Sequence, residues 1–368
     1  MKIVYILEQF HLHGGAEKIT CIKANWFAKK GFDVTIISNN QNTKKNIYSL
    51  EKSIKFIDLG INYKTGTSYL HPKHLILVPK HIIKLHKALT KIKPDVVILL
   101  SLQFDYYFLP FITKSKIIRE FHSSRYLYNT NRNKNNSFFK KFKYKLHDFI
   151  EKKYTYNVIL TPEEKKHYNS QNTIIIPNGI NNTAKQTAKL INKTVISAGR
   201  IAPVKGLDKL INTWYIVAKK HSDWKLEIYG GGNKKDIEKL QEQINKLNLQ
   251  KQVCLCGQTD DLNSKMLEAS IYVMSSKTEC FPMVLLEAQS IGLPIVSFDC
   301  PYGPRNIITN NQDGILVEDQ NNDKLANAIM QLIENKNTRI EMGKTAKKNI
   351  LKLQEQEVMN MWFKLFKA

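Results

Sequence analysis

Two carboxylates that could bind one ligand flank a proline in the segment Glu279-Cys-Phe-Pro-Met-Val-Leu-Leu-Glu287. Proline is favoured in the first turn of a helix, so Pro282 is predicted to open a helix whose free amides begin at Met283 and Val284. Such amides bind anions, and carboxylates accept hydrogen bonds from sugar hydroxyls. The segment therefore suits a ligand with both phosphate and sugar, although two ordinary helix-flanking glutamates would give the same pattern.

A second group of candidate residues follows a predicted strand at 194–198, in the segment Gly199-Arg200-Ile-Ala-Pro-Val-Lys205-Gly206. Ligands of open parallel sheets bind at the carboxyl ends of the strands. Arg200 can hold a phosphate with its planar guanidinium, and Lys205 adds a mobile positive charge. Together they could stabilise a departing diphosphate, whereas solvation at the surface is the simpler explanation of two cations.

Glycine turns follow three further predicted strands. The first is His13-Gly14-Gly15-Ala16-Glu17, which opens a helix but lacks the third glycine of the dinucleotide-binding fingerprint. The others contain Gly231, within Tyr229-Gly-Gly-Gly232, and Gly257. Glycine lets a phosphate, a ribose or a flat ring approach the backbone closely, although turn geometry alone would also explain these residues.

The elements that must position these residues alternate between short apolar runs and helical stretches, which is typical of parallel sheets with crossover helices. Strands are predicted at 2–7, 33–38, 54–59, 95–101, 116–121, 157–160 and 173–176, and then at 194–198, 224–229, 252–256, 271–275, 294–298 and 314–317. Helices are predicted at 16–30, 207–220, 234–247, 261–268, 283–291 and 322–335, and from 336 to the end. The predicted fold class is α/β, with two doubly wound parallel sheets facing each other across a cleft.

A chain of 368 residues exceeds the size at which one core stops growing, so two domains are expected. The first is predicted at 1–176 and is followed by a polar linker at 177–193. The second is predicted at 194–345, and the apolar edge of the helix at 346–368 is predicted to dock back on the first.

The formal charge of +24 is concentrated in the first half. Residues 1–176 hold 30 Lys and Arg against 12 Asp and Glu, while 177–368 hold 26 against 20. The stretch Arg132–Lys153 has eight basic and two acidic residues, with Phe138, Phe139, Phe142, Tyr144 and Phe149 among them. This composition favours an anionic membrane surface, while a solvated lysine-rich face and nucleic acid are the alternatives.

Other features restrict the class of protein to which the chain can belong. No apolar run is long enough to cross a membrane, and the first apolar run is too short for a signal peptide. Five cysteines, an odd number, argue against a disulfide framework and for a reducing cytosol. No Asp-x-Asp pair is present, and no metal or other cofactor is expected.

In their order and spacing these segments resemble the family-four retaining glycosyltransferases with the GT-B architecture. The resemblance is carried by Gly14-Gly15, Pro177-Asn178-Gly179, Gly199-Arg200, Lys205-Gly206, Gly230 to Gly232, Gly257, the paired glutamates, Pro294 and the strand Gly314–Val317. Cys280 departs from the family, which usually has glycine there, so the choice of donor is less secure than the type of reaction. The segment Ser297–Asn306 resembles bacterial members that add hexoses or N-acetylhexosamines to surface glycans.

The resemblance implies roles for individual residues. It implies Arg200 and Lys205 on the diphosphate of a nucleotide sugar, Glu287 on the ribose hydroxyls and Glu279 near the sugar ring. Gly15 would approach the phosphates from the first, acceptor-side domain. In Glu120-Phe-His-Ser, His122 lies where the family places a histidine against the donor sugar, although a core or surface histidine is the simpler explanation.

The expected function is retaining transfer of a hexose or N-acetylhexosamine from a UDP-sugar to a hydroxyl of a lipid-linked bacterial glycan, such as lipopolysaccharide, capsule or O-antigen. The expected location is the cytoplasm, at the inner face of the cell membrane, with no nucleic acid as partner. A GT-B sugar-nucleotide epimerase and a non-catalytic protein that binds glycans or membranes are the alternatives.

Overall fold

The computed structural model describes residues 1–12, 14–64, 71–100, 104–126, 132, 137–181 and 186–368. His13 and parts of the predicted basic stretch and linker lie outside the described residues. The chain divides into two compact units: unit 1 is Met1–Gly179 with Glu355–Ala368, and unit 2 is Ile180–Gln354. No helix among the described residues is both long and apolar enough to cross a bilayer.

Unit 1 contains a sheet of seven strands, in the order β3-β2-β1-β4-β5-β6-β7. The strands are β1 (Lys2–Leu7), β2 (Asp33–Ser38), β3 (Lys55–Asp58), β4 (Val96–Leu99), β5 (Lys116–Glu120), β6 (Tyr156–Ile159) and β7 (Thr173–Ile175). Every neighbouring pair is parallel. The central strands are nearly continuous apolar runs because helices cover both faces of the sheet.

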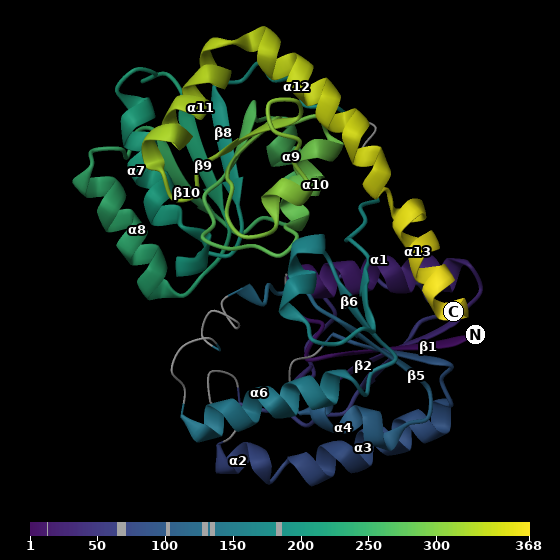
Figure 1. The fold of residues 1–368 in the computed structure, drawn as a ribbon. Helices are drawn as coiled ribbons and strands as arrows, with labels where there is room; N and C mark the ends of the chain where they lie inside the picture. Colours follow the sequence, from purple (N-terminus) through teal and green to yellow (C-terminus); the bar gives the residue numbers. More distant parts are fainter. Residues whose placement is uncertain (13, 65–70, 101–103, 127–131, 133–136, 182–185) are drawn as a thin grey trace. The chain divides into compact units, whose positions relative to one another are not determined.

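Two helix layers enclose this sheet (Figure 1). One consists of α1 (Gly15–Lys29) and α13 (Glu355–Lys367), which pack Phe27 against Phe366 with ring centroids 5.0 Å apart. The other consists of α2 (Pro72–Leu75), α3 (Val78–Ile92), α4 (Asp105–Ile112) and α6 (Phe138–Glu151). A short 3-10 helix, η1 (Pro162–His167), follows β6.

Unit 2 contains a parallel sheet of six strands, in the order β10-β9-β8-β11-β12-β13. The strands are β8 (Thr194–Ala198), β9 (Lys225–Tyr229), β10 (Val253–Gly257), β11 (Ile271–Met274), β12 (Ile295–Phe298) and β13 (Gly314–Val317). The helices are η2 (Pro203–Lys205), α7 (Leu207–Ala218), α8 (Lys234–Lys246), α9 (Leu262–Leu267), α10 (Met283–Ser290), η3 (Pro304–Asn306), α11 (Asn322–Glu334), α12 (Lys336–Asn349) and η4 (Ile350–Leu353). Trp214 of α7 is fully buried in the core of this unit.

The predicted α/β class with two doubly wound parallel sheets is confirmed, and every predicted strand is present within two residues of its predicted ends. The boundaries between units differ from those predicted. Part of the predicted linker packs on unit 2, where Arg339 donates to the Leu190 carbonyl at 3.1 Å. The final helical stretch divides at residue 355 rather than 346, because α12 packs in unit 2 and α13 in unit 1.

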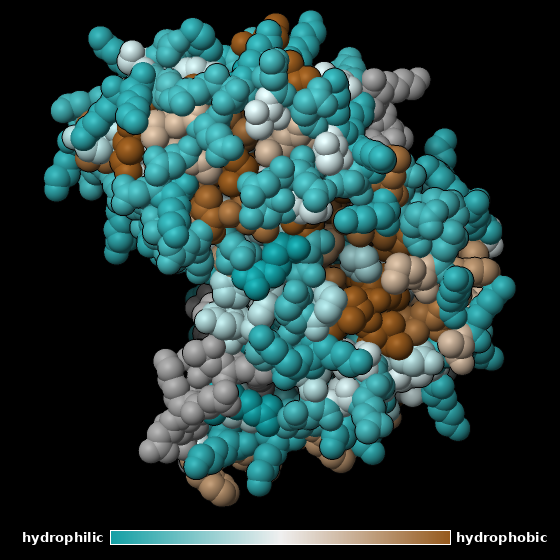
Figure 2. Space-filling model, turned by 45° about the horizontal axis from the view of Figure 1, so that its top comes forward, coloured by the Kyte–Doolittle hydropathy of each residue, from teal (hydrophilic) through white to brown (hydrophobic). Residues whose placement is uncertain are grey.

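The surface in Figure 2 is mostly hydrophilic, as expected for a chain with 24% charged residues.

Candidate functional site

The predicted donor residues of unit 2 lie where the strand order reverses. Strands β8 and β11 are neighbours, although β9 and β10 separate them in the chain. Such a switch point leaves a crevice at the carboxyl ends of the strands, where ligands bind in open α/β sheets. Gly199 and Arg200 follow β8, and the loop that leads to Glu279 follows β11.

Lys205 and Glu279 meet at this switch point. Lys205 Nζ lies 2.6 Å from Glu279 Oε1, and the two side chains keep 28% and 12% of their surface exposed. Ser276 donates from Oγ to the same carboxylate oxygen at 2.7 Å. The pair is therefore held in a fixed geometry and is still open enough for a ligand to reach.

Gly206 fixes the backbone beside Lys205. Its φ of +61° lies in the left-handed region, and a Cβ added there would lie 2.2 Å from the Ser275 carbonyl oxygen. Ser275 Oγ donates to the Lys205 carbonyl at 3.0 Å. These contacts join the loop after β8 to the loop after β11, so both loops position the Lys205 side chain.

Tyr272 of β11 belongs to this site, and the sequence analysis missed it. Its side chain is fully buried and its hydroxyl donates to the Ala198 carbonyl, at the end of β8, at 3.0 Å. Burial raises the pKa of Tyr272, and the charges of Glu279 and Glu287 raise it further. The only feature of the sequence that could have pointed to Tyr272 is the presence of a phenol in an otherwise aliphatic strand. Its hydroxyl lies within electrostatic reach of both predicted glutamates.

The helix predicted after Pro282 is present as α10, but Pro282 is its N-cap rather than its first helical residue. The first backbone bond there runs from the Leu285 N–H to the Pro282 carbonyl at 3.1 Å, so the amides of Met283 and Val284 precede the helical bonds. Glu287 is half-buried, one turn farther along α10.

Glu279 and the start of α10 are close together in space. A Cβ added to Gly303 would lie 2.8 Å from both Glu279 Cβ and Pro282 Cδ. The glycine therefore lets the chain after β12 pass between them. The residue that carries the carboxylate of the Lys205 pair therefore lies close to the N-cap of the helix.

The remaining predicted residues of unit 2 lie at the same edge of the sheet. Arg200 is exposed and forms no ion pair within the part of the chain that the structure describes. Gly231 follows β9, and Gly257 is the last residue of β10. The structure thus brings Lys205 and Glu279 into contact and leaves Arg200 with its guanidinium at the surface.

In unit 1, His122 follows β5 and contacts a buried ion pair. Glu120 and Lys23 of α1 are bonded to each other, and each side chain is only 1% exposed. His122 Nε2 lies 3.1 Å from the other oxygen of Glu120. Burial acts to raise the pKa of Glu120, but Lys23 and His122 outweigh it and hold that pKa at about 2. His122 therefore has a permanent anion beside its ring.

The first turn of α1 lies within electrostatic reach of His122. Gly14 is the N-cap of α1 and Gly15, its first residue, is exposed. Burial raises the pKa of Glu17 in the first turn, while the charge of His122 acts to lower it. The sequence analysis assigned no role to Lys23 or Glu17, because a charged residue on a core-facing helix position shows its partner only in the folded chain.

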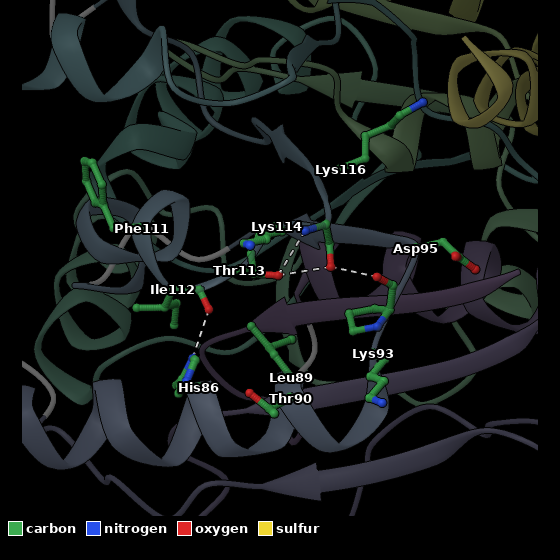
Figure 3. A pocket seen from close by; sticks show the side chains of 12 residues that line it. His86, Leu89, Thr90, Lys93, Asp95, Phe111, Ile112, Thr113, Lys114 and Lys116 are labelled. Atoms are coloured by element: carbon green, nitrogen blue, oxygen red, sulfur yellow. Dashed lines mark hydrogen bonds between the residues drawn. The ribbon is translucent and has the colours of Figure 1, made fainter.

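A cavity of about 710 Å³ lies at the other edge of the unit 1 sheet. Its walls include Lys93, Asp95 and Lys116, at the amino-terminal ends of β4 and β5, and Phe111 of α4 (Figure 3). His86 contacts the Ile112 carbonyl across it at 2.9 Å. None of the predicted site residues lines this cavity. Within the described residues, no three His, Cys, Asp or Glu side chains gather so as to hold a metal ion.

Comparisons with known proteins place the chain among enzymes that transfer sugars. Residues 180–349 match the family described as Glycosyl transferases group 1. An uncharacterised glycosyltransferase of Haemophilus influenzae is 28% identical over 359 residues, which cover 93% of each chain. A poly(ribitol-phosphate) alpha-N-acetylglucosaminyltransferase of Staphylococcus aureus is 30% identical over 220 residues, which are 57% of this chain but only 43% of that protein.

The fold has close structural counterparts. Staphylococcus aureus TarM, solved with fondaparinux, alpha-GlcNAc-glycerol and UDP, superposes with a TM-score of 0.79. The match covers 100% of both chains at 18% sequence identity. At this identity the likeness concerns the fold.

Proposed function

Because the chain is a glycosyltransferase of GT-B fold that carries a Glycosyl transferases group 1 domain at residues 180–349, we propose that it moves a hexose or N-acetylhexosamine from a UDP-sugar to a bacterial surface glycan. The donor is supported by the UDP found in the TarM structure. The acceptor class is supported by the Staphylococcus aureus relative, whose name gives a poly(ribitol-phosphate) acceptor.

The observation that carries this proposal is the Lys205–Glu279 pair beside the start of α10. Cleavage of the anomeric C–O bond builds negative charge on the leaving diphosphate, so fixed positive groups there stabilise the transition state. Lys205 and the amides of Met283 and Val284 are the groups at this edge that offer positive charge and free donors. Exposed Arg200 adds a guanidinium that is free to close on the diphosphate.

The same arrangement assigns the carboxylates. Glu279, held in place by Lys205, accepts hydrogen bonds from sugar hydroxyls, and Glu287 accepts from the ribose hydroxyls. With retention, the acceptor hydroxyl attacks on the face that the diphosphate leaves, and its proton passes to a donor phosphate oxygen. The reaction then needs no protein general base, and cationic side chains take the place of a divalent metal. Contact of His122 with the donor sugar remains a prediction of the family resemblance.

The acceptor in this proposal is lipid-linked, and the enzyme acts in the cytoplasm at the inner face of the cell membrane. The basic stretch Arg132–Lys153 supports this location because anionic head groups attract lysine and arginine.

The test is turnover of UDP- and GDP-sugars with a lipid-linked acceptor extract, with and without EDTA, by the native enzyme, Lys205→Ala and Glu287→Ala. We expect UDP release that depends on the extract, survives EDTA and falls in both variants, and a product with the donor's anomeric configuration by NMR. Full turnover in both variants would refute the site. Epimerised nucleotide sugar without acceptor would indicate the epimerase, and glycan binding without turnover would indicate the non-catalytic alternative.

A further inference from the structure

We propose that the layer formed by α3, α4 and α6 in unit 1 is a docking face for a bilayer that contains anionic phospholipids. The inference rests on the proposed function in that it names the surface by which the enzyme would reach a lipid-linked acceptor. The sequence pattern pointed to one segment, Arg132–Lys153. The fold adds α3 and α4, which come much earlier in the chain, to the same surface.

The three helices form one continuous layer. They lie side by side on the same face of the unit 1 sheet (Figure 1) and share one hydrophobic core that includes Leu85, Leu109 and Ile150. The Tyr106 hydroxyl of α4 donates to the His147 carbonyl of α6 at 2.9 Å. Residues exposed on these helices therefore face outward together.

The outward charge of this layer is positive. Exposed lysines on α3 are Lys80, Lys84, Lys87 and Lys91, and on α6 they are Lys140, Lys141, Lys143 and Lys145. Lys84 donates a hydrogen bond from Nζ to the Leu59 carbonyl. The other three lysines of α3, Lys80, Lys87 and Lys91, are spaced so that they lie on one side of the helix.

Acidic residues on the three helices do not offset this charge at the surface. Helix α3 contains no Asp or Glu. Asp105 of α4 is fully buried, and Glu151 of α6 is 1% exposed. Asp148 of α6 binds the Arg132 guanidinium, with Nη1 and Oδ1 2.8 Å apart. A flat anionic surface would therefore meet lysines without facing an unpaired carboxylate on these helices.

Large apolar side chains stand among the lysines. Phe138, Phe142 and Phe149 are 79%, 58% and 52% exposed on α6, at spacings of four and seven residues that align them along one stripe. Phe111 of α4 is 62% exposed and Ile83 of α3 is 53% exposed. Soluble surfaces seldom gather such residues, whereas a membrane interface accepts them between its head groups. These apolar side chains favour a bilayer over a nucleic acid, because the attraction of a nucleic acid comes from its phosphates and acts on the positive charge alone.

The experiment measures binding of the full-length protein to vesicles of phosphatidylcholine with and without phosphatidylglycerol, by flotation. The test variant replaces lysines of the layer: Lys80→Gln, Lys87→Gln, Lys141→Gln and Lys145→Gln. The matched control makes the same change of charge on unit 2 with exposed lysines: Lys235→Gln, Lys239→Gln, Lys246→Gln and Lys251→Gln. Each lysine near an anionic surface is worth roughly a fivefold change in partitioning, about 1 kcal/mol.

We expect the native protein to bind the anionic vesicles, more weakly as salt is raised. The affinity of the layer variant for anionic vesicles should fall on the order of 100-fold or more, and the affinity of the control variant should fall far less. Phe138→Ser with Phe142→Ser should remove the binding that persists at high salt. Equal loss in the layer and control variants would overturn the proposal, as would binding of double-stranded DNA or RNA in preference to the vesicles.

A second readout separates this inference from the proposed function. Hydrolysis of the UDP-sugar donor without membranes should be the same in the layer variant and the native enzyme, because none of the replaced residues belongs to the candidate site. Donor turnover together with failure of the native protein to bind anionic vesicles would refute the docking face and leave the transferase intact. Vesicle binding without any donor turnover would refute the transferase and leave the docking face intact.

Discussion

Replacement of Lys23 by methionine should destabilise unit 1 by about 3–5 kcal/mol, because it leaves a charged carboxylate buried without its partner. Glu120 and Lys23 are each 1% exposed, and Lys23 Nζ also lies 4.2 Å from the ring centre of Trp362. Water therefore cannot take the place of the ammonium. Lys29, on the same helix, provides the control: its Nζ lies 3.4 Å from Glu51 Oε1 and the two side chains are 64% and 40% exposed, so Lys29→Met should cost less than about 1 kcal/mol.

The effect of Lys23→Met should depend on pH in a defined direction. In the native protein the pKa of Glu120 is about 2, below its ordinary value, so the stability that it contributes is present above about pH 4.5 and is lost as the pH falls toward 2. Without Lys23, burial raises the pKa of Glu120 above its ordinary value. Protonation of Glu120 at low pH therefore removes the buried, unpaired charge and makes the variant less unstable. The stability difference between native protein and variant should therefore be largest near pH 7 and should shrink toward pH 4.

Hydrogen exchange of peptides from α1 and α13 at increasing urea concentrations measures the stability of unit 1 apart from that of unit 2. If Lys23→Met loses no more unit 1 stability than Lys29→Met does, the reasoning is refuted. A difference between native protein and Lys23→Met that grows as the pH is lowered would also refute it.

Three further outcomes are expected in unit 2. Lys205→Met should lower kcat for UDP release by about 10²–10³-fold, while Lys225→Met, an exposed charge at the other end of the sheet, should leave kcat unchanged. Gly206→Ala should lower the melting temperature and kcat together, because its Cβ would lie 2.2 Å from the Ser275 carbonyl oxygen and must displace the loop; an unchanged melting temperature would contradict this. Tyr272→Phe should cost about 1–3 kcal/mol in urea unfolding, since it removes the bond that the hydroxyl donates to the Ala198 carbonyl at 3.0 Å and the one it accepts from the Ala198 N–H at 3.3 Å; stability equal to the native protein would show that these bonds have no net value.

The sequence predicted the strands well because parallel strands buried on both faces are nearly continuous apolar runs. It also predicted the helix after Pro282, since proline and the following apolar residues signal a helix start locally. The family resemblance to GT-B glycosyltransferases is confirmed by the group 1 domain and the fold. The family-four assignment, the retaining mechanism and the metal-free reaction remain predictions.

The pairing of charges could not be read from the sequence. Lys205 and Glu279 are 74 residues apart, and their contact depends on β8 lying beside β11 on one side, with β9, its successor in the chain, on the other. The partner of Lys23 could not be read from the sequence either, since Glu120 is 97 residues away on β5. The helices α3, α4 and α6 were expected only as unspecified crossovers, so the continuity of their exposed lysines emerged from the fold.

In both lysine–glutamate pairs the glutamate lies at or after the carboxyl end of a parallel strand of its unit, yet the exposure of the two pairs assigns them different roles. The pair of Lys23 and Glu120 is closed to solvent, so it fixes the anion beside His122 and should respond to mutation mainly through stability. The pair of Lys205 and Glu279 is 28% and 12% exposed, so a ligand can compete for either charge and mutation should act mainly on turnover. A Lys205→Met enzyme that unfolds more easily but turns over normally would reverse this assignment, because its pair would then serve only to hold the fold.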